Sequence, residues 1–199
     1  MSKSKANYHH GDLRDSLVQV AGQMLQNQGI DALSMRKLAE HVGVSRTAPY
    51  HHFKDKNDLL CAIAEDGFRL QDSIVSAEDC QQLEALVQAY IQFATTHPAH
   101  YDLMYGGKIW KENLATESLQ SASRDSFRHW LARIEQLRRQ GIINQQETTV
   151  RIAQVAWATL HGLCRLANDG VYIDRNQVME MGRSAARMML GNTLRHQDE

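Results

Sequence analysis

The chain has 199 residues, with 22 Lys and Arg against 23 Asp and Glu and a formal net charge of −1. Two prolines and twelve glycines are few breakers for this length, which excludes a many-turned β-sandwich or barrel and predicts an all-α protein. Three scattered cysteines exclude a disulfide framework, and the lack of an apolar leader or of a run of about 18 apolar residues predicts a cytoplasmic protein with no membrane partner.

The first predicted helix follows a polar arm at residues 1–11, which we expect to be flexible. Asp12 can cap this helix, and Gly29 stands where a left-handed residue is expected after the last turn. Between them the apolar residues recur with helical spacing, at Leu13, Leu17, Val20, Ala21, Met24 and Leu25.

Two short helices are predicted next, over Met35–Val42 and from Ser45 to about Phe53. Ser34 and Ser45 are their expected N-caps. Gly43 supplies the positive φ that a tight turn between steeply crossing helices needs. This layout is typical of a helix-turn-helix motif, whose second helix enters the major groove of DNA.

The exposed residues predicted for the second short helix suit a DNA partner. They are hydrogen-bond donors and one flat aromatic, which can read guanine edges and hold phosphates. They are Ser45, Arg46, Thr47, Tyr50, His51 and Lys54. The charge distribution agrees, because residues 1–58 carry a net charge of +2 and residues 59–199 a net charge of −3.

Longer helices are predicted for the rest of the chain, the first of them capped by Asp55. The others are expected near 80–97, 98–105, 114–140, 146–169 and 174–193. Their breaks are Pro98, Gly106-Gly107, Gly141 and Asp169-Gly170. The predicted domains are the arm at 1–11, a DNA-binding domain at 12–58, a connecting helix at 59–78, and a ligand-binding and dimerisation domain at 79–199.

Matched positions between residues 12 and 62 have the joint spacing of one family. The positions are Ala21-x3-Leu25-x3-Gly29-x2-Ala32-Leu33-Ser34-Met35-Arg36-x-Leu38-Ala39-x3-Gly43-Val44-Ser45-x4-Tyr50-x2-Phe53-x2-Lys56-x2-Leu59-Leu60. This run resembles the N-terminal domain of TetR/AcrR-type transcriptional regulators, which commonly carry an aliphatic residue where Pro49 stands. Farther on, Trp157-x3-His161-Gly162 resembles the Trp-His-Gly motif in the C-terminal domain of one subgroup.

The resemblance implies a homodimeric DNA-binding regulator, usually a repressor, with a small-molecule pocket in its C-terminal helical domain. The DNA contacts that it implies are Ser34 and Arg36 on the backbone, Arg46, Thr47 and Ala48 on the bases, and Tyr50, His51 and Lys56 on the phosphates. The arm with Lys3 and Lys5 either extends along the DNA or is disordered.

Aromatic, methionine and histidine side chains on the central helices are candidate ligand contacts. They are Tyr90, Phe93, His97, Met104, Tyr105, Trp110, Phe127, Trp130, Trp157 and His161. Core packing is the alternative, because aromatic residues with helical spacing usually pack in a core. Trp157 and His161 are four residues apart, so their side chains should touch. His161 either has a structural role inside the domain or senses the ligand.

The segment from Val150 to Leu166 is predicted to be apolar on two faces, one of which needs a partner to cover it, and the last helix has a similar Met-rich face. A self-complementary pairing of both helices across a two-fold axis would do so, and a larger monomeric core is the alternative. The candidate interface residues are Val155, Thr159, Leu163, Leu166, Met181, Ala185, Met188 and Met189.

Catalysis is not expected, because the sequence contains no GxSxG, GxxxxGK[ST] or GxGxxG motif. His97 and His100 stand beside Pro98 and make a weak metal-binding pattern, so we expect no metal and no cofactor.

The predicted function is that of a dimeric repressor, released from a palindromic DNA operator by an unknown small-molecule effector. Three alternatives stay open. One is a helical small-molecule-binding protein or enzyme with a vestigial helix-turn-helix. The others are a regulator that works with a protein partner instead of a ligand, and an activator.

Overall fold

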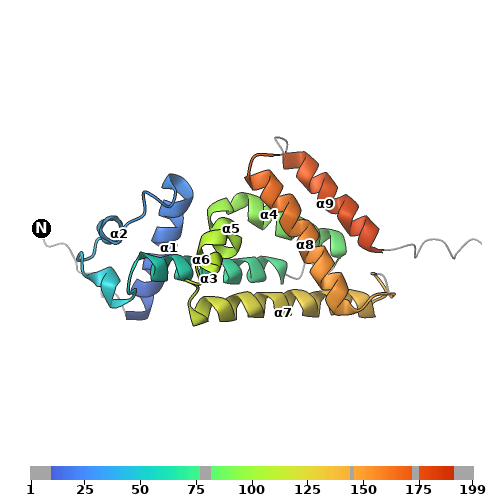
Figure 1. Cartoon of the computed structure of the whole chain (residues 1–199), viewed down its shortest axis with the longest axis horizontal. Coiled ribbons are helices and arrows are strands. Elements are labelled where there is room, and N and C mark those ends of the chain that lie inside the picture. The colour runs from blue at the N-terminus through green and yellow to red at the C-terminus, as the bar shows by residue number, and fades with distance from the viewer. Residues whose placement is uncertain (1–9, 77–81, 144–145, 172–174, 191–199) are drawn as a thin grey trace, which may run out of the picture. The chain divides into compact units, whose positions relative to one another are not determined.

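The computed structural model describes residues 10–76, 82–143, 146–171 and 175–190, without the side chains of residues 10–12, 175, 176, 189 and 190. The regular structure in these ranges is helical throughout, which confirms the all-α prediction. Figure 1 shows the helices in chain order. They are α1 (His10–Gln28), α2 (Met35–Val42), the 3-10 helix η1 (Ala48–His51), α3 (Lys56–Val75), α4 (Leu83–Thr96), α5 (Pro98–Tyr105), α6 (Gly107–Lys111), α7 (Glu117–Arg139), α8 (Thr149–Asn168) and α9 (Arg175–Leu190).

The described residues divide into two compact units, whose boundaries differ from those of the predicted domains. Unit 1 contains residues up to Gly67 together with 99–120, and unit 2 contains residues 68–98 and those from Ser121 onward. Segment 99–120, predicted as part of the C-terminal domain, therefore packs with the helix-turn-helix region. The functional domains themselves stay a prediction, since the units describe packing alone.

Unit 1 is built on α1, α2 and the first part of α3. Leu17, Leu38 and Leu59, one from each helix, are fully buried. Segment 99–120 joins them through α5. The α5 backbone N–H of Ala99 donates to Gln26 Oε1 on α1 at 3.3 Å. On α3, a Cβ added at Gly67 would lie only 2.7 Å from Met104 Sδ, so a larger residue there would force the Met104 side chain of α5 to move.

A polar strip on α3, formed by Asn57, Cys61 and Glu65, holds the loop before α7. Asn57 Nδ2 donates to the Leu114 carbonyl at 2.9 Å, and the Cys61 thiol donates to the same oxygen at 3.5 Å. Burial raises the pKa of Cys61, which keeps it a protonated donor. Thr116 Oγ1 donates to Glu65 Oε1 at 3.4 Å and accepts from the Leu119 N–H at 3.2 Å, so one hydroxyl both contacts α3 and caps α7.

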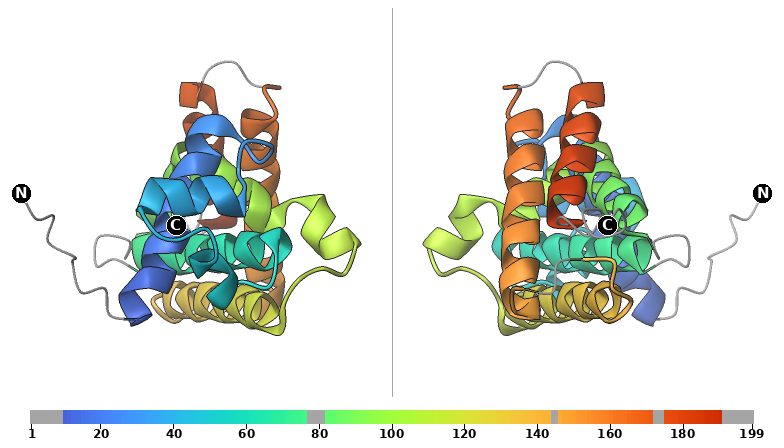
Figure 2. Two further views of the ribbon diagram at one scale, coloured as in Figure 1. Left: turned by 90° about the vertical axis from the view of Figure 1, so that its left-hand side faces the viewer. Right: turned by 90° about the vertical axis from the view of Figure 1, so that its right-hand side faces the viewer.

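Unit 2 contains α4, α8, α9 and α7 from Ser121 onward, with the last residues of α3. Helices α8 and α9 lie side by side, and both contact α4 (Figures 1 and 2). The core is formed by the sides that face one another, at Leu86 and Ile91 of α4, Leu160 of α8 and Val178 of α9. Trp130 on α7 donates its Nε1–H to the Ala153 carbonyl of α8 at 2.9 Å within this core.

Several predicted helix limits need correction. The first helix begins at His10, so Asp12 lies in its first turn and is not its cap. Helix α7 begins at Glu117 and not near 114, because Thr116 caps it. The short helix α6 was not predicted, since Gly106-Gly107 was interpreted only as a break; Gly106 is instead its N-cap. The breaks expected at Gly29, Gly141 and Gly170 are confirmed, each with φ between 72° and 79°.

Candidate nucleic-acid interface

Helix α2 is positioned by a cap at each end. Ser34 has an extended backbone, and its Oγ accepts from the Lys37 N–H at 3.3 Å, as predicted. Met35, Leu38 and Ala39 are buried, so the opposite side of the helix, with Arg36 and Lys37, faces solvent. This burial fixes which side of α2 is available to a partner.

Gly43 ends α2 and redirects the chain. Its φ of 77° lies in the left-handed region, and its N–H donates to the carbonyls of Ala39 (3.0 Å) and Glu40 (3.3 Å). The Val44 N–H also donates to the Ala39 carbonyl, at 3.0 Å. Together these bonds turn the chain from α2 into the next element, as the sequence predicted.

The second element of the motif differs from the predicted helix between Ser45 and Phe53. Only Ala48–His51 is helical, in 3-10 geometry, and its N-cap residue is Thr47. Pro49 explains the difference, because it lacks the N–H that would make the first α-helical bond back to Ser45. The Ser45 carbonyl accepts from the Ala48 N–H at 3.0 Å instead, and the Ser45 hydroxyl pairs with that of Thr47 at 3.1 Å.

Buried Pro49 and Phe53 anchor this element to the rest of unit 1, which leaves its polar side chains outside. Of the ten predicted DNA contacts, seven are exposed and three are half-buried. The exposed ones are Arg36, Ser45, Arg46, Thr47, Tyr50, His51 and Lys54, and the half-buried ones are Ser34, Ala48 and Lys56. Tyr50 is 58% exposed, which is unusual for a large ring and leaves it free to contact a partner.

Lys56 has a structural contact that the sequence did not predict. Its Nζ donates to the Ile30 carbonyl at 2.7 Å, which ties the loop after α1 to the start of α3. An ammonium group has three donors, so this bond does not prevent a phosphate contact.

The acidic residues near the interface are engaged by the backbone. Asp55 Oδ1 accepts from the Asp58 N–H at 2.9 Å, which makes Asp55 the predicted cap of α3. Asp58 Oδ2 accepts from the Lys54 N–H, also at 2.9 Å. No described carboxylate forms an ion pair with Arg46 or Lys54, so both side chains keep their positive charge available to an anionic partner.

Sequence reasoning did not identify Arg14 as part of this surface. The guanidinium carbon of Arg14 lies 5.4 Å from the centroid of the Phe53 ring, in a cation–π contact. The available signal was an arginine between Leu13 and Leu17 on the apolar side of the first predicted helix.

The ten candidate ligand contacts do not form one cluster. Met104, Tyr105 and Trp110 belong to unit 1, and the other seven belong to unit 2. In unit 2 the Tyr90 and Trp130 rings pack in the core, 6.0 Å apart. Phe93 packs against His97 at 5.4 Å.

A separate aromatic group in unit 2 is formed by Phe127, Trp157 and His161, all of them half-buried. The Phe127 and Trp157 rings lie edge to face at 6.4 Å. The Trp157 and His161 rings stack at 5.5 Å with 19° between their planes, which confirms the predicted contact. Burial, and secondarily the charge of Arg165, lowers the pKa of His161, so this imidazole is neutral at pH 7.

The predicted interface residues lie on exposed or half-buried sides of α8 and α9. Large apolar side chains are exposed at Val155 (53%), Leu166 (39%), Met181 (37%) and Met188 (82%). Thr159, Leu163 and Ala185 are half-buried, and the side chain of Met189 lies outside the described residues.

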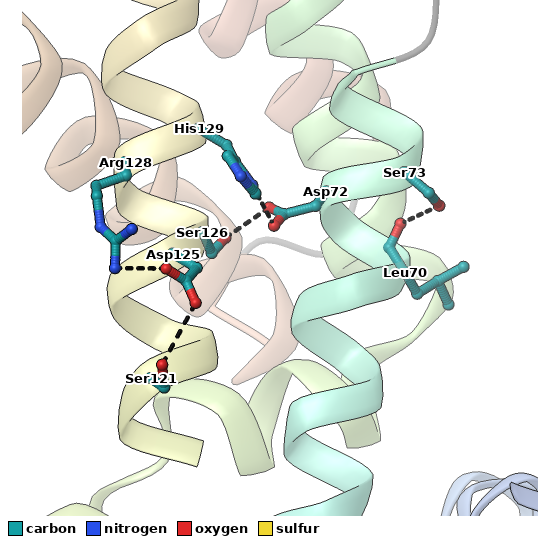
Figure 3. Close-up of polar contacts among 8 residues, drawn as sticks. All are labelled: Leu70, Asp72, Ser73, Ser121, Asp125, Ser126, Arg128 and His129. Carbon is teal, nitrogen blue, oxygen red and sulfur yellow. Dashed lines mark hydrogen bonds and ion pairs between the residues drawn. The ribbon is translucent and has the colours of Figure 1, made fainter. Parts of the chain in front are cut away.

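A serine, a histidine and an aspartate meet between α3 and α7 in unit 2 (Figure 3). The Ser126 hydroxyl donates to Asp72 Oδ1 at 2.7 Å, and His129 Nδ1 lies 2.8 Å from Asp72 Oδ2. The carboxylate therefore lies between the hydroxyl and the imidazole, whereas a serine nucleophile must contact the imidazole directly. This group braces the two helices.

No group of three metal-binding side chains occurs among the described residues. No helix in the described ranges is long and apolar enough to cross a membrane.

Comparisons with known proteins match both parts of the chain. The family described as "Bacterial regulatory proteins, tetR family" matches residues 17–63, and "Tetracyclin repressor-like, C-terminal domain" matches residues 83–190. A solved structure of a Rhodococcus sp. RHA1 protein of unknown function is 32% identical, with a TM-score of 0.75 over 94% of this chain and 100% of that one.

Two curated relatives match over shorter stretches. Nucleoid occlusion factor SlmA of Aliivibrio fischeri is 30% identical over 134 residues, which are 64% of this chain and 67% of SlmA. The class C tetracycline repressor of Escherichia coli is 42% identical over 52 residues, which are 26% of this chain and 24% of the repressor. With a family match over more than half of its length, the chain belongs to the TetR family of DNA-binding transcriptional regulators, which are not enzymes.

Proposed function

We propose that the chain is a homodimeric repressor that binds a palindromic operator and leaves it when a small molecule binds. The observation that carries the proposal is the exposed donor set around η1, held in place by buried Pro49 and Phe53. The proposed role is carried out in the cytoplasm, where such a regulator would meet its operator.

The proposed contacts divide by chemistry. Arg46 and Thr47 reach base edges in the major groove, with Ala48 against them and Ser45 beside them. Ser34 and Arg36 contact the DNA backbone from α2. Phosphates are held by the basic and aromatic side chains of the second element and of α3, at Tyr50, His51, Lys54 and Lys56.

Dimerisation is proposed through α8 and α9. The exposed side chains of Val155, Leu166, Met181 and Met188 would be covered by the same surface of a second copy, as a two-fold interface requires. Such a dimer presents two reading elements, which fit successive major grooves when they are about 34–36 Å apart.

The effector site is proposed at the half-buried Phe127, Trp157 and His161 group, whose rings and neutral imidazole suit an apolar or amphipathic molecule. Tetracycline is not implied, because the match to the class C repressor covers only 52 residues. The Trp-His-Gly subgroup stays part of this proposal, carried by Trp157, His161 and Gly162.

A second candidate is a DNA-binding nucleoid occlusion factor. It is favoured by the match to the nucleoid occlusion factor SlmA, which extends over 134 residues and is longer than the tetracycline repressor match. An activator role is compatible with the first candidate, since the sign of regulation depends on where the operator lies.

Selection of bound sequences from randomised duplex DNA tests the proposal. An enriched inverted repeat is the expected result, and binding to it should weaken steeply as salt rises. Arg46→Ala should cost about 1–3 kcal/mol of binding free energy if Arg46 reads a guanine with two hydrogen bonds. An equal loss on every operator base variant would make Arg46 a phosphate contact, and no enrichment would overturn sequence-specific binding.

The dimer is tested separately by sedimentation. Val155→Asp on the proposed interface should yield monomers and weaken operator binding, whereas Gln154→Asp, on the exposed but different side of α8, should leave the dimer intact. A dimer that survives Val155→Asp and Met181→Asp together would contradict the proposed interface.

A further inference from the structure

Arg14 on α1 is attached to the DNA-reading element by its contact with Phe53. The guanidinium carbon lies 5.4 Å from the ring centroid. Phe53 is 1% exposed, and its N–H donates to the Pro49 carbonyl of η1 at 2.9 Å. The ring that Arg14 covers is therefore part of the same turn that carries Tyr50, His51 and Lys54.

The contact with the Phe53 ring leaves the hydrogen-bond donors of Arg14 available. Arginine has five N–H donors, and the described residues accept none of those of Arg14. An arginine restrained by a ring in this way can bind an anion.

The charge of Arg14 has no carboxylate partner among the residues that the structure describes. Three arginines of unit 2 do have one: Arg128 pairs with Asp125 at 2.5 Å, Arg139 with Glu135 at 2.9 Å, and Arg165 with Asp169 at 2.9 Å. Arg14 is nevertheless half-buried, an environment in which an unpaired charge is costly. A ligand anion would complete the site.

We propose that Arg14 is a further DNA-binding residue, which contacts a backbone phosphate while Phe53 holds its guanidinium in place. The inference rests on the proposed function, in that the surface around η1 must face DNA. It adds α1 to an interface that otherwise consists of α2, η1 and the start of α3.

The test is the salt dependence of DNA binding by the full chain, measured by fluorescence anisotropy on mixed-sequence duplex DNA and on the enriched operator. Each phosphate contact contributes about 0.9 to the slope of log K against log salt. Arg14→Gln should reduce the slope by about one unit and weaken binding about eightfold at 0.1 M salt, equally on every sequence. Arg124→Gln, at an exposed arginine of α7, is the matched control and should change neither value.

Arg14→Lys separates a phosphate contact from a purely structural role. Lysine retains the charge but lacks the planar guanidinium and its five donors, so the slope should return to the wild-type value while affinity recovers only in part. An unchanged slope in Arg14→Gln would overturn the inference even if the variant is less stable. If wild-type protein binds no duplex DNA, the proposed function fails as well, which is a different result from a normal slope in the variant.

Discussion

The hydroxyl of Thr116 has two roles, and removing it should cost more than either one alone. Thr116→Val keeps the shape of the side chain but removes both the cap of α7 and the hydrogen bond to Glu65. A lost N-cap costs about 1 kcal/mol, and a lost hydrogen bond to a buried acceptor about 1 kcal/mol or more. Glu65 is only 4% exposed, so water does not readily replace the lost donor. We expect the free energy of unfolding to fall by about 2 kcal/mol, from the sum of these two terms.

Urea unfolding, followed by circular dichroism, measures this loss. In a thermal scan the same change should lower Tm by about 4–8 °C for a chain of this size. Thr116→Ser is the matched control, because serine keeps the hydroxyl and loses only a methyl group, at about 0.8 kcal/mol or less. The reasoning is refuted if Thr116→Val lies within about 0.5 kcal/mol of wild type, or if Thr116→Ser is equally damaging.

Other substitutions test the turn, the core and the neutral histidine. Gly43→Ala should lose about 1 kcal/mol of stability in urea unfolding, because its φ of 77° strains any residue with a Cβ. Trp130→Phe should lose about 1–3 kcal/mol in the same assay by leaving the buried Ala153 carbonyl without its 2.9 Å donor. Because the pKa of His161 in the folded protein lies below its ordinary value of 6.5, the unfolded chain binds more protons than the folded protein as the pH falls toward and below 6.5. Stability should therefore fall as pH decreases from 6.5 through the lowered pKa, and His161→Gln should reduce that loss in Tm measured against pH.

Local signals made the fold of the N-terminal third predictable. Ser34 and Gly43 act within a few residues of themselves, so their types alone mark the two ends of α2. The second element was harder to predict, because Ser45 resembles the N-cap of an α-helix, whereas Pro49 has no N–H to donate to the Ser45 carbonyl. Which of the two signals prevails depends on how buried Pro49 packs, and this packing cannot be deduced from the sequence.

Long-range packing explains what the sequence did not predict. Segment 99–120 belongs to unit 1 because Gly67 admits Met104 and because the α3 polar strip holds Leu114 and Thr116, contacts that join residues 37 to 57 positions apart. The candidate DNA contacts were named from residue type and family resemblance, and their exposure agrees with that role. The ligand candidates were chosen by residue type alone, so they fall into separate groups in both units.

The loop between α6 and α7 has a consequence for protein engineering. Most surface loops accept inserted residues, but this one is fixed at Leu114 and Thr116 to Asn57 and Glu65, side chains about two turns apart on α3. Asn113, just before them, has a φ of 54°, a conformation that asparagine tolerates better than most residues. A single inserted residue would move Leu114 and Thr116 out of register with Asn57 and Glu65 together. Tags, reporter domains and circularly permuted ends should therefore be placed elsewhere, and loop length between α6 and α7 should vary little among functional variants.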